Sequence, residues 1–475
     1  MSLSRPLSAV LLIATVVSPE LIRAQLPPAP GGPCELLVEA RNAASPPRFQ
    51  SSEQPSGERN TFVGGGARWT CPAQGIVVLA DSVEYYGDPR IIYLIGHVEY
   101  TEPRLRLTSE RLTYWLNEER LRSEGNVDAT LPSGTNLKGP SVDYYRPAPR
   151  IRLQSRMVAP GRPTIRIVER DSTGGLSDPV VVIANTIVME ADSLVFASGR
   201  VELTRIDAVA RADSMALDNG RQFGRLMRKP VVEGKGQRPF TLYGSVIDIF
   251  GRDRLLERAV SSGEARAVSE DVTLTADTLD FRMGESKLQR AYAWGKSRAR
   301  AVSPSYDIVA DSLDVEMPGQ RVQRVVGVRN AHAESAPDSL KIRSTERDWM
   351  DGDTIVARFD TLRASDSTAR AEIRELKALG HARSYYQLGA QDSTALKPAI
   401  NYVKGKTITV AFEARLVKTV TIAGQESGLY LEPVVAADAG TQRATSSPAM
   451  SPAAAPPPAP AKTRSVPPRP PGRVP

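Results

Sequence analysis

The sequence predicts an all-β protein built of stacked hairpin rungs, and two observations support this. Apolar and polar side chains alternate with a period of two, for example at Leu105/Leu107 and Leu112/Tyr114. This period is typical of strands with one buried face and forms no helical stripe. A unit of about 30 residues also recurs between residue 76 and about residue 432. One two-stranded rung is marginal in water, so neighbouring rungs must cover its apolar face.

The clearest copy of the unit begins at residue 76. It opens with the hexad Ala80–Tyr85, crosses a turn at Gly87-Asp88-Pro89, returns through Arg90–Ile95 and reaches a glycine step at Gly96-His97-Val98. Glycine, aspartate and proline favour a tight turn between the two strands. The glycine of the step predicts a bend or bulge where the chain passes to the next pairing.

The spacing between hexad and glycine defines the repeat. The second residue of the hexad lies 14 to 18 residues before the glycine in the pairs Asp81 and Gly96, Ser109 and Gly125, Asn185 and Gly199, Asp277 and Gly295, and Asp311 and Gly327. Weaker copies are predicted within residues 212–215, 243–249, 360–382 and 405–424. In this pattern Asp and Ser are expected to bond the backbone at strand starts.

Composition changes along the chain predict its organisation. Residues 1–24 resemble a secretory signal, with Arg5, an apolar core from Leu7 to Val17 and a cleavage point at Ala24-Gln25. A linker with N-terminal edge strands follows at 25–75, then a first repeat block at 76–172 and a second at 178–432. The pattern lapses between 146 and 179, which is either an inserted loop or the boundary between the blocks. The Ala/Pro-rich residues 433–475 are predicted to be a disordered tail.

The charge of the chain argues against nucleic-acid binding. The formal net charge is +7, but the tail carries about +4 of it and the leader about +1. A nucleic-acid binder is expected to gather positive charge and aromatic platforms on its folded part.

Cys34 and Cys71 are the only cysteines. In an oxidising, exported compartment they are predicted to form a disulfide that ties the N-terminal segment to the first rung, the alternative being two free thiols. Closing a loop of this length stabilises by about 3 to 4 kcal/mol in the chain-entropy model.

Tandem A-D-x-Φ-x-[YF] hexads, each followed after about 15 residues by G-x-V, resemble the OstA-like family, which includes the LptA-like lipopolysaccharide-transport proteins and the N-terminal domain of LptD. Ala80–Tyr85 with Gly96–Val98, and Ala276–Phe281 with Gly295, carry the resemblance, which covers roughly residues 76 to 432. It implies an elongated, open (taco-like) β-jellyroll whose apolar trough holds acyl chains and whose end strands pair with other envelope components.

The resemblance also implies a function. The protein is expected to shelter lipopolysaccharide or a similar amphipathic lipid in the periplasm, free or associated with the outer membrane, during outer-membrane assembly. Fourteen residues are expected to face inward by their position in the repeat, where they either contact lipid in the trough or pack as an ordinary core. They are Val83, Tyr85, Val98, Tyr100, Leu105, Leu107, Leu112, Tyr114, Ile187, Met189, Val201, Leu203, Leu279 and Phe281.

No motif in the sequence predicts catalysis, a cofactor or a metal. The three histidines, His97, His332 and His381, are far apart, and two of them follow equivalent glycines, which favours surface positions over metal ligation. The repeated Asp-Ser pairs lack a nearby base. Two other interpretations stay open: a structural β-solenoid scaffold of the envelope or surface without ligand, and a carbohydrate-active β-helix, which needs two carboxylates about 5 to 10 Å apart in a cleft.

Overall fold

A computed structural model describes residues 37–40, 48–168, 178–235, 238–252, 255–284, 287–336, 344–360, 372–388, 397–413 and 416–433. In these residues the regular elements are β-strands and two short 3-10 turns, η1 (Pro72–Gln74) and η2 (Pro318–Gln320). The described part of the chain contains no apolar helix of membrane-spanning length. The all-β prediction is confirmed.

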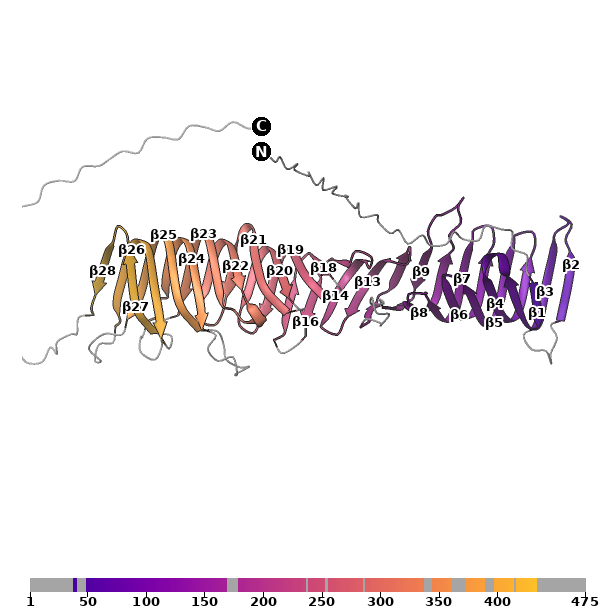
Figure 1. The fold of residues 1–475 in the computed structure, drawn as a ribbon, viewed down its shortest axis with the longest axis horizontal. Helices are drawn as coiled ribbons and strands as arrows, with labels where there is room; N and C mark the ends of the chain where they lie inside the picture. The colour runs from indigo at the N-terminus through magenta and orange to yellow at the C-terminus, as the bar shows by residue number, and fades with distance from the viewer. Residues whose placement is uncertain are drawn as a thin grey trace, which may run out of the picture. The chain divides into compact units, whose positions relative to one another are not determined.

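The strands follow one another in chain order (Figure 1). The first are β1 (Leu37–Ala40), β2 (Arg48–Glu53), β3 (Arg59–Cys71), β4 (Ile76–Tyr86), β5 (Ile91–Glu102), β6 (Leu105–Trp115), β7 (Arg120–Thr130), β8 (Asn136–Tyr145), β9 (Arg156–Pro160), β10 (Thr164–Ile167), β11 (Val180–Ile183), β12 (Thr186–Glu190), β13 (Leu194–Thr204) and β14 (Ala208–Asp218). The others are β15 (Phe223–Met227), β16 (Val231–Gly234), β17 (Phe240–Tyr243), β18 (Val246–Arg252), β19 (Leu255–Ser269), β20 (Thr273–Gly284), β21 (Lys287–Val302), β22 (Asp307–Glu316), β23 (Arg324–Ser335), β24 (Asp348–Asp360), β25 (Glu372–Leu388), β26 (Ala399–Glu413), β27 (Leu416–Ala423) and β28 (Ser427–Leu431).

Long strands bend at a corner where the antiparallel register shifts. Between β4 and β5, Leu79 pairs with Glu99 and Ser82 pairs with Ile95, so three residues of β5 lie opposite two of β4. This is a β-bulge, as the glycine step predicts. Its first two residues, Gly96 and His97, have φ angles of 80° and 43°, a region that glycine enters without strain.

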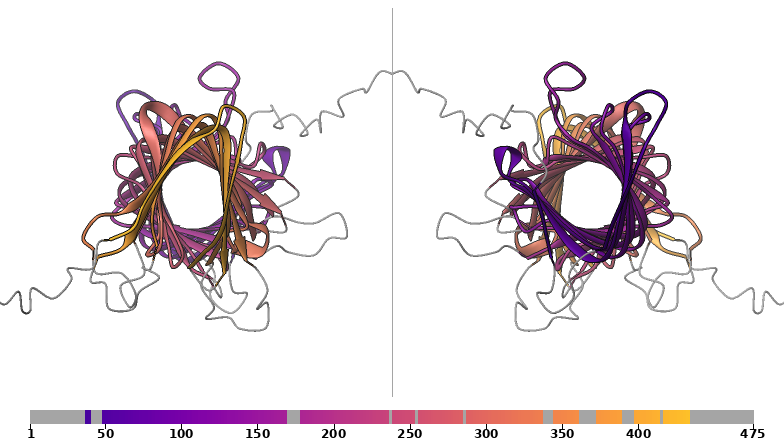
Figure 2. Two further views of the ribbon diagram at one scale, coloured as in Figure 1. Left: turned by 90° about the vertical axis from the view of Figure 1, so that its left-hand side faces the viewer. Right: turned by 90° about the vertical axis from the view of Figure 1, so that its right-hand side faces the viewer.

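The corner divides the strands into two arms. We call the arm that contains Val98–Glu102 and Leu105–Thr108 the first arm, and the arm that contains Ile91–Ile95 and Arg111–Trp115 the second arm. Viewed along the stack, the strands surround a common axis (Figure 2), and their inward side chains fill the interior. The turns farthest from the corner form a first and a second rim, which face each other along a line that we call the mouth.

The same corner recurs along the stack. Consecutive residues with positive φ occur at Gly65-Gly66, Gly96-His97, Gly125-Asn126, Gly161-Arg162, Gly199-Arg200, Arg228-Lys229, Gly263-Glu264, Arg329-Asn330, Gly380-His381 and Gly424-Gln425. A side chain of the preceding strand, the anchor, packs over the corner glycine. A Cβ on Gly125, for example, would lie 2.5 Å from a carboxylate oxygen of Glu110. The repeat spacing therefore reflects an anchor and a glycine that meet across two strands.

The structure corrects three of the sequence assignments. Glu110, rather than Ser109, is the anchor opposite Gly125. The corner after Asp311 is Arg329-Asn330, rather than Gly327, and Asn330 donates a hydrogen bond to the Asp311 carboxylate over 3.4 Å. The anchor opposite Gly380 is Asp353 rather than Asp360, the first residue of the copy predicted within 360–382. Asparagine tolerates positive φ better than most residues, so glycine is not required at every corner.

The anchors also bond differently from the prediction. They lie in the middle of bent strands rather than at strand starts, and most bond side chains of the corner. The Asp81 carboxylate is hydrogen-bonded to His97 Nδ1 over 2.7 Å, and the Glu110 carboxylate accepts a hydrogen bond from Asn126 Nδ2 over 2.6 Å. Asp277 matches the prediction in part, since its carboxylate accepts backbone hydrogen bonds from residues 296 and 297.

Hydrogen bonding continues through the region where the sequence pattern lapses. The two ends of β8 pair with β9 and β10, which pair in turn with β12 and β11, and both of those pair with β13. These pairings close a ring of six strands, β8 to β13. In this ring the short strands β9 and β12 pair in one arm, and β10 and β11 pair in the other. A second ring of this kind is formed by β14 to β19.

Residues 25–75 contain edge strands, as the sequence predicts: β1 and β2 pair along the outer side of β3. The segments Thr61–Val63 and Arg68–Thr70, which also read as candidate edge strands, instead belong to the one bent strand β3. Cys71 ends β3, is fully buried and is disulfide-bonded. Cys34, the leader and the predicted tail lie outside the described residues.

Candidate functional site

The interior between the two arms is the candidate site. Its apolar core extends as one cluster from Val63 to Val410. Of the fourteen residues predicted to face inward, twelve are buried, while Tyr85 and Tyr114 are half-buried and pack against the same core. The predicted side-chain register is therefore that of the structure, and it places these residues inside a core that is largely filled by their own side chains.

In the N-terminal part of the stack, a polar network closes the mouth. We call it the clasp; it joins Gln74, Tyr100, Glu102, Tyr114, Glu119, Tyr144 and Arg146. Arg146, on the second rim, donates hydrogen bonds to Glu102 over 2.8 Å and to Gln74 over 3.2 Å, both on the first rim. Only 12% of the Arg146 side chain and 5% of the Glu102 side chain are exposed. The clasp thus contains a buried ion pair across the mouth.

Tyrosines complete the clasp. Tyr144 and Tyr100 donate hydrogen bonds to the two carboxylate oxygens of Glu102, over 2.7 and 2.9 Å. Burial raises the pKa of both phenols well above the ordinary value, and the nearby Glu102 raises it further. Both hydroxyls therefore stay protonated and act as donors, which satisfies the buried carboxylate.

Farther along the stack, aromatic contacts replace the clasp. Phe240 of the first arm and Phe281 of the second have ring centroids 6.4 Å apart, and Tyr306 and Phe359 lie 4.9 Å apart. Ring pairs at these distances attract one another beyond the area that they bury. The arms meet here through apolar side chains.

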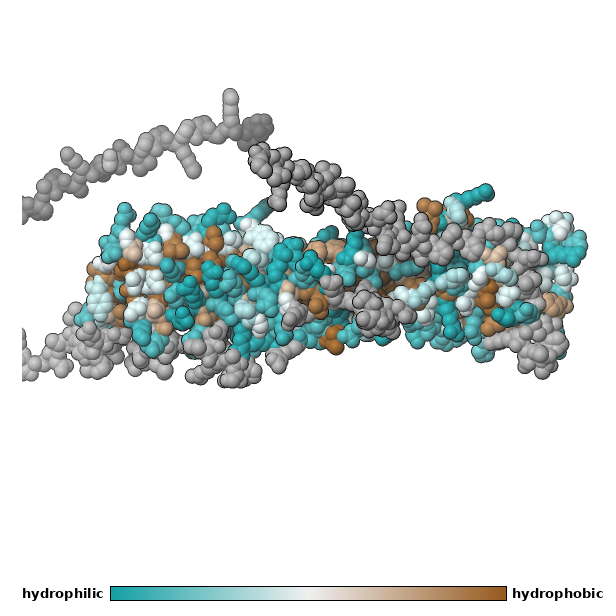
Figure 3. Space-filling model, viewed as in Figure 1, coloured by the Kyte–Doolittle hydropathy of each residue, from teal (hydrophilic) through white to brown (hydrophobic). Residues whose placement is uncertain are grey.

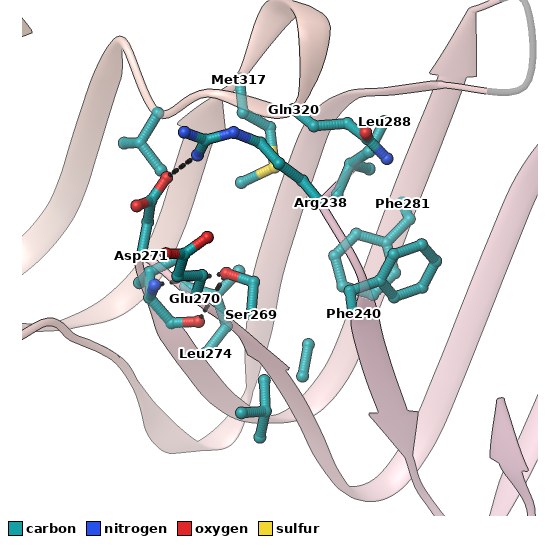
Figure 4. A pocket seen from close by; sticks show the side chains of 14 residues that line it. Arg238, Phe240, Ser269, Glu270, Asp271, Leu274, Phe281, Leu288, Met317 and Gln320 are labelled. Carbon is teal, nitrogen blue, oxygen red and sulfur yellow. Dashed lines mark hydrogen bonds and ion pairs between the residues drawn. The ribbon is translucent and has the colours of Figure 1, made fainter. Parts of the chain in front are cut away.

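Two cavities interrupt this apolar part of the mouth. The first, of about 40 Å³, is lined by Phe240, Leu274, Phe281 and Met317 and by the Arg238–Asp271 ion pair (Figure 4). The second, of about 110 Å³, is lined by Tyr306, Ile308, Ala333, Ile373, Leu376, Tyr386, Phe412 and Val417, and by polar groups at its edge.

The second cavity has an acidic edge. Its lining includes Glu334, Asp348 and Glu372, and no Lys, Arg or His occurs among the described residues that line it. Asp348 is 7% exposed, and burial raises the pKa of its carboxyl to about 6. Its Oδ1 accepts a backbone hydrogen bond from Gln387 over 2.8 Å, which opposes part of that effect.

The outer surface is mainly polar. It is mostly hydrophilic on the face shown in Figure 3, with apolar residues gathered over the C-terminal strands. On the second arm, arginine and aspartate of neighbouring strands pair bidentately, as in Arg225–Asp248 and Arg258–Asp280, at 2.7 to 2.9 Å. Many of the basic side chains along the strands are thus engaged in ion pairs.

The histidines form no common site. His97 and His381 follow corner glycines on the outer surface, where each contacts its anchor aspartate. His332 lies on the outer face between Asp351 and Glu334, at 2.6 and 3.0 Å. Where the structure describes the chain, no three His, Cys, Asp or Glu side chains are grouped to hold a metal ion.

Sequence reasoning missed the clasp and the acidic cavity. One signal was present: the inward alternation Val98, Tyr100 continues to Glu102, which places a carboxylate on the buried face. Its partner Arg146 is 44 residues away in the chain, and no local pattern connects the two. No protein-family model matches the chain, and no curated protein is significantly similar to it in sequence.

Proposed function

We propose that this protein is a non-enzymatic carrier of outer-membrane biogenesis, which shelters the acyl chains of lipopolysaccharide or a similar amphipathic lipid between its two arms in the periplasm, as a taco-like open jellyroll. The observation that carries the proposal is an apolar interior that continues from rung to rung and meets the mouth at two cavities. Each described backbone pairing joins two residues of the same arm, even where a strand pair runs through both arms, so the arms can part without breaking the ladder.

The energetics suit reversible carriage. Burying a methylene group stabilises by about 0.8 kcal/mol, so several methylenes hold a lipid without a covalent step. A cavity of about 110 Å³ is somewhat smaller than the apolar cavity of about 150 Å³ that takes up a benzene ring in another protein. It therefore accommodates a few methylenes, and a longer chain enters only as the rims separate.

The second candidate is a structural scaffold of the envelope without ligand. The observation that favours it is the filled interior, where residues such as Leu107, Leu121 and Ile187 are fully buried by neighbouring side chains. A scaffold needs no opening of the mouth, whereas a carrier does.

Photo-crosslinking in the native cell envelope separates the two functions. A benzophenone amino acid at Phe281 or Phe412, which contact the cavities, is expected to capture lipid. The same probe at Tyr93, which is 37% exposed on the outer face, is the matched aromatic control. Lipid adducts at Phe281 and Phe412 but not at Tyr93 support the carrier. Folded protein without adducts at either inner position supports the scaffold.

A further inference from the structure

Asp348 is exceptional among the buried carboxylates of this chain. Within the described residues, the other buried acidic side chains each pair with arginine: Glu102 with Arg146, Asp271 with Arg238, Asp280 with Arg258, and Asp307 with Arg300. Asp348 is as buried as these, yet its hydrogen bonds come from the neutral Gln387, through the backbone N–H and side-chain Nε2. Buried carboxylates are normally paired with a cation because an unpaired buried charge is costly.

The position of Asp348 adds a second observation. It lines the larger cavity, beside apolar side chains of both arms such as Tyr386, Leu376 and Phe412. Tyr386 is 2% exposed, and its ring packs against Phe412 with a centroid distance of 6.2 Å. The cavity therefore combines a carboxylate at its edge with apolar walls, an arrangement suited to a ligand with a charged head and an apolar body.

The charge of the edge fixes the sign of the ligand. Of the other carboxylates that line the cavity, Glu334 is paired with Arg347 at 3.3 Å. An anionic head would therefore meet repulsion from the Asp348 carboxylate, which has no cationic partner among the described residues. A cationic donor would instead supply the partner that arginine gives to the other buried carboxylates, through a charge-assisted hydrogen bond.

We propose that the cavity bounded by Asp348, Tyr386 and Phe412 binds an amphiphile with a primary ammonium head, the ammonium pairing with the Asp348 carboxylate and the first methylenes of the tail lying between the arms. This inference rests on the proposed function, because it uses the same interior to hold an alkyl chain. It assigns to the C-terminal part of the mouth a preference for cationic amphiphiles.

The test compares three probes of equal chain length on the full chain by titration calorimetry at pH 8: dodecylammonium and dodecanoate below their micelle concentrations, and dodecanol below its solubility limit. Dodecylammonium is expected to bind at least about tenfold more tightly than dodecanol, as a charge-assisted hydrogen bond implies, and dodecanoate most weakly. Asp348→Asn keeps the acceptor for Gln387 and is expected to abolish the difference between dodecylammonium and dodecanol. Asp178→Asn, an exposed residue outside the cavity, makes the same change in net charge and is expected to keep it.

The outcomes are distinguishable. Equal binding of dodecanol and dodecylammonium, or a preference that persists in Asp348→Asn, overturns this inference and leaves the lipid carrier standing. Absence of binding by all three probes overturns both. Ala333→Leu, which fills the cavity from its wall, is expected to weaken dodecylammonium; unchanged binding would place the ammonium elsewhere and refute the assignment.

Discussion

The clasp makes a quantitative prediction about stability. Arg146→Ala removes the hydrogen bonds to Glu102, Glu119, Tyr114 and Gln74 and leaves the Glu102 carboxylate buried without its cation. Breaking a buried ion pair by removing one partner costs about 3 to 5 kcal/mol. We expect a loss of this size in the free energy of unfolding, measured by urea denaturation at pH 7 and followed by tyrosine and tryptophan fluorescence.

Two controls decide whether the buried charge is the cause. The double variant Glu102→Gln/Arg146→Met removes both charges of the buried pair, leaves only the partly exposed Glu119 carboxylate in the clasp, and is expected to be more stable than Arg146→Ala alone. Arg106 contacts Glu99 at 3.7 Å on the surface and is 68% exposed in its side chain, so Arg106→Ala is expected to cost less than about 1 kcal/mol. Arg146→Ala within about 1 kcal/mol of the wild type would refute the clasp as a stabilising closure of the mouth.

Three further perturbations test the corner and the titrating groups. Gly125→Ala is expected to destabilise the protein more than Gly57→Ala. Both glycines have positive φ, but only Gly125 lies against an anchor, whereas a Cβ on Gly57 would have nothing within 4 Å. Equal melting temperatures of the two variants would contradict the anchor packing. Burial lowers the pKa of His332, but the carboxylates of Asp351 and Glu334 raise it by more. The contribution of His332 to the free energy of unfolding is therefore present below about pH 6.5 and is lost as the pH rises through the raised pKa. His332→Gln should therefore destabilise at pH 5.5 and have little effect at pH 9, and a loss independent of pH would exclude this titration. Burial raises the pKa of Asp348 to about 6, so the contribution of Asp348 to the free energy of unfolding should fall as the pH rises from about 4 to 6. Asp348→Asn should be more stable than the wild type by about 2 to 3 kcal/mol above pH 7 and similar to it near pH 4, and chemical denaturation that showed no gain at pH 8 would contradict this cost.

The stack could be predicted from the sequence because its signals are local. Alternation identifies half-buried strands, and glycine marks a corner that needs positive φ. These local rules failed where another residue met the same need. Asn330 replaces glycine at one corner, and Glu110 rather than the adjacent Ser109 reaches across to Gly125.

The mouth could not be predicted in the same way. Whether Phe240 meets Phe281, or Arg146 meets Glu102, depends on how far apart the two arms lie, which is set by packing across the interior. Repeat patterns give the face on which a residue lies and say nothing about the residue opposite it on the other arm. The unpaired state of Asp348 likewise becomes visible only when its neighbours in space are known.

The alternation of anchor and glycine has a consequence for how such a protein can change its length. An anchor strand such as β4 or β6 is followed by a glycine strand such as β5 or β7. Gain or loss of two consecutive strands would keep every anchor opposite a corner with positive φ, whereas gain or loss of one would set two anchors or two such corners side by side. The smallest heritable change in length that preserves the fold is therefore about 30 residues, and insertions of any other size are tolerated only in the turns along the rims.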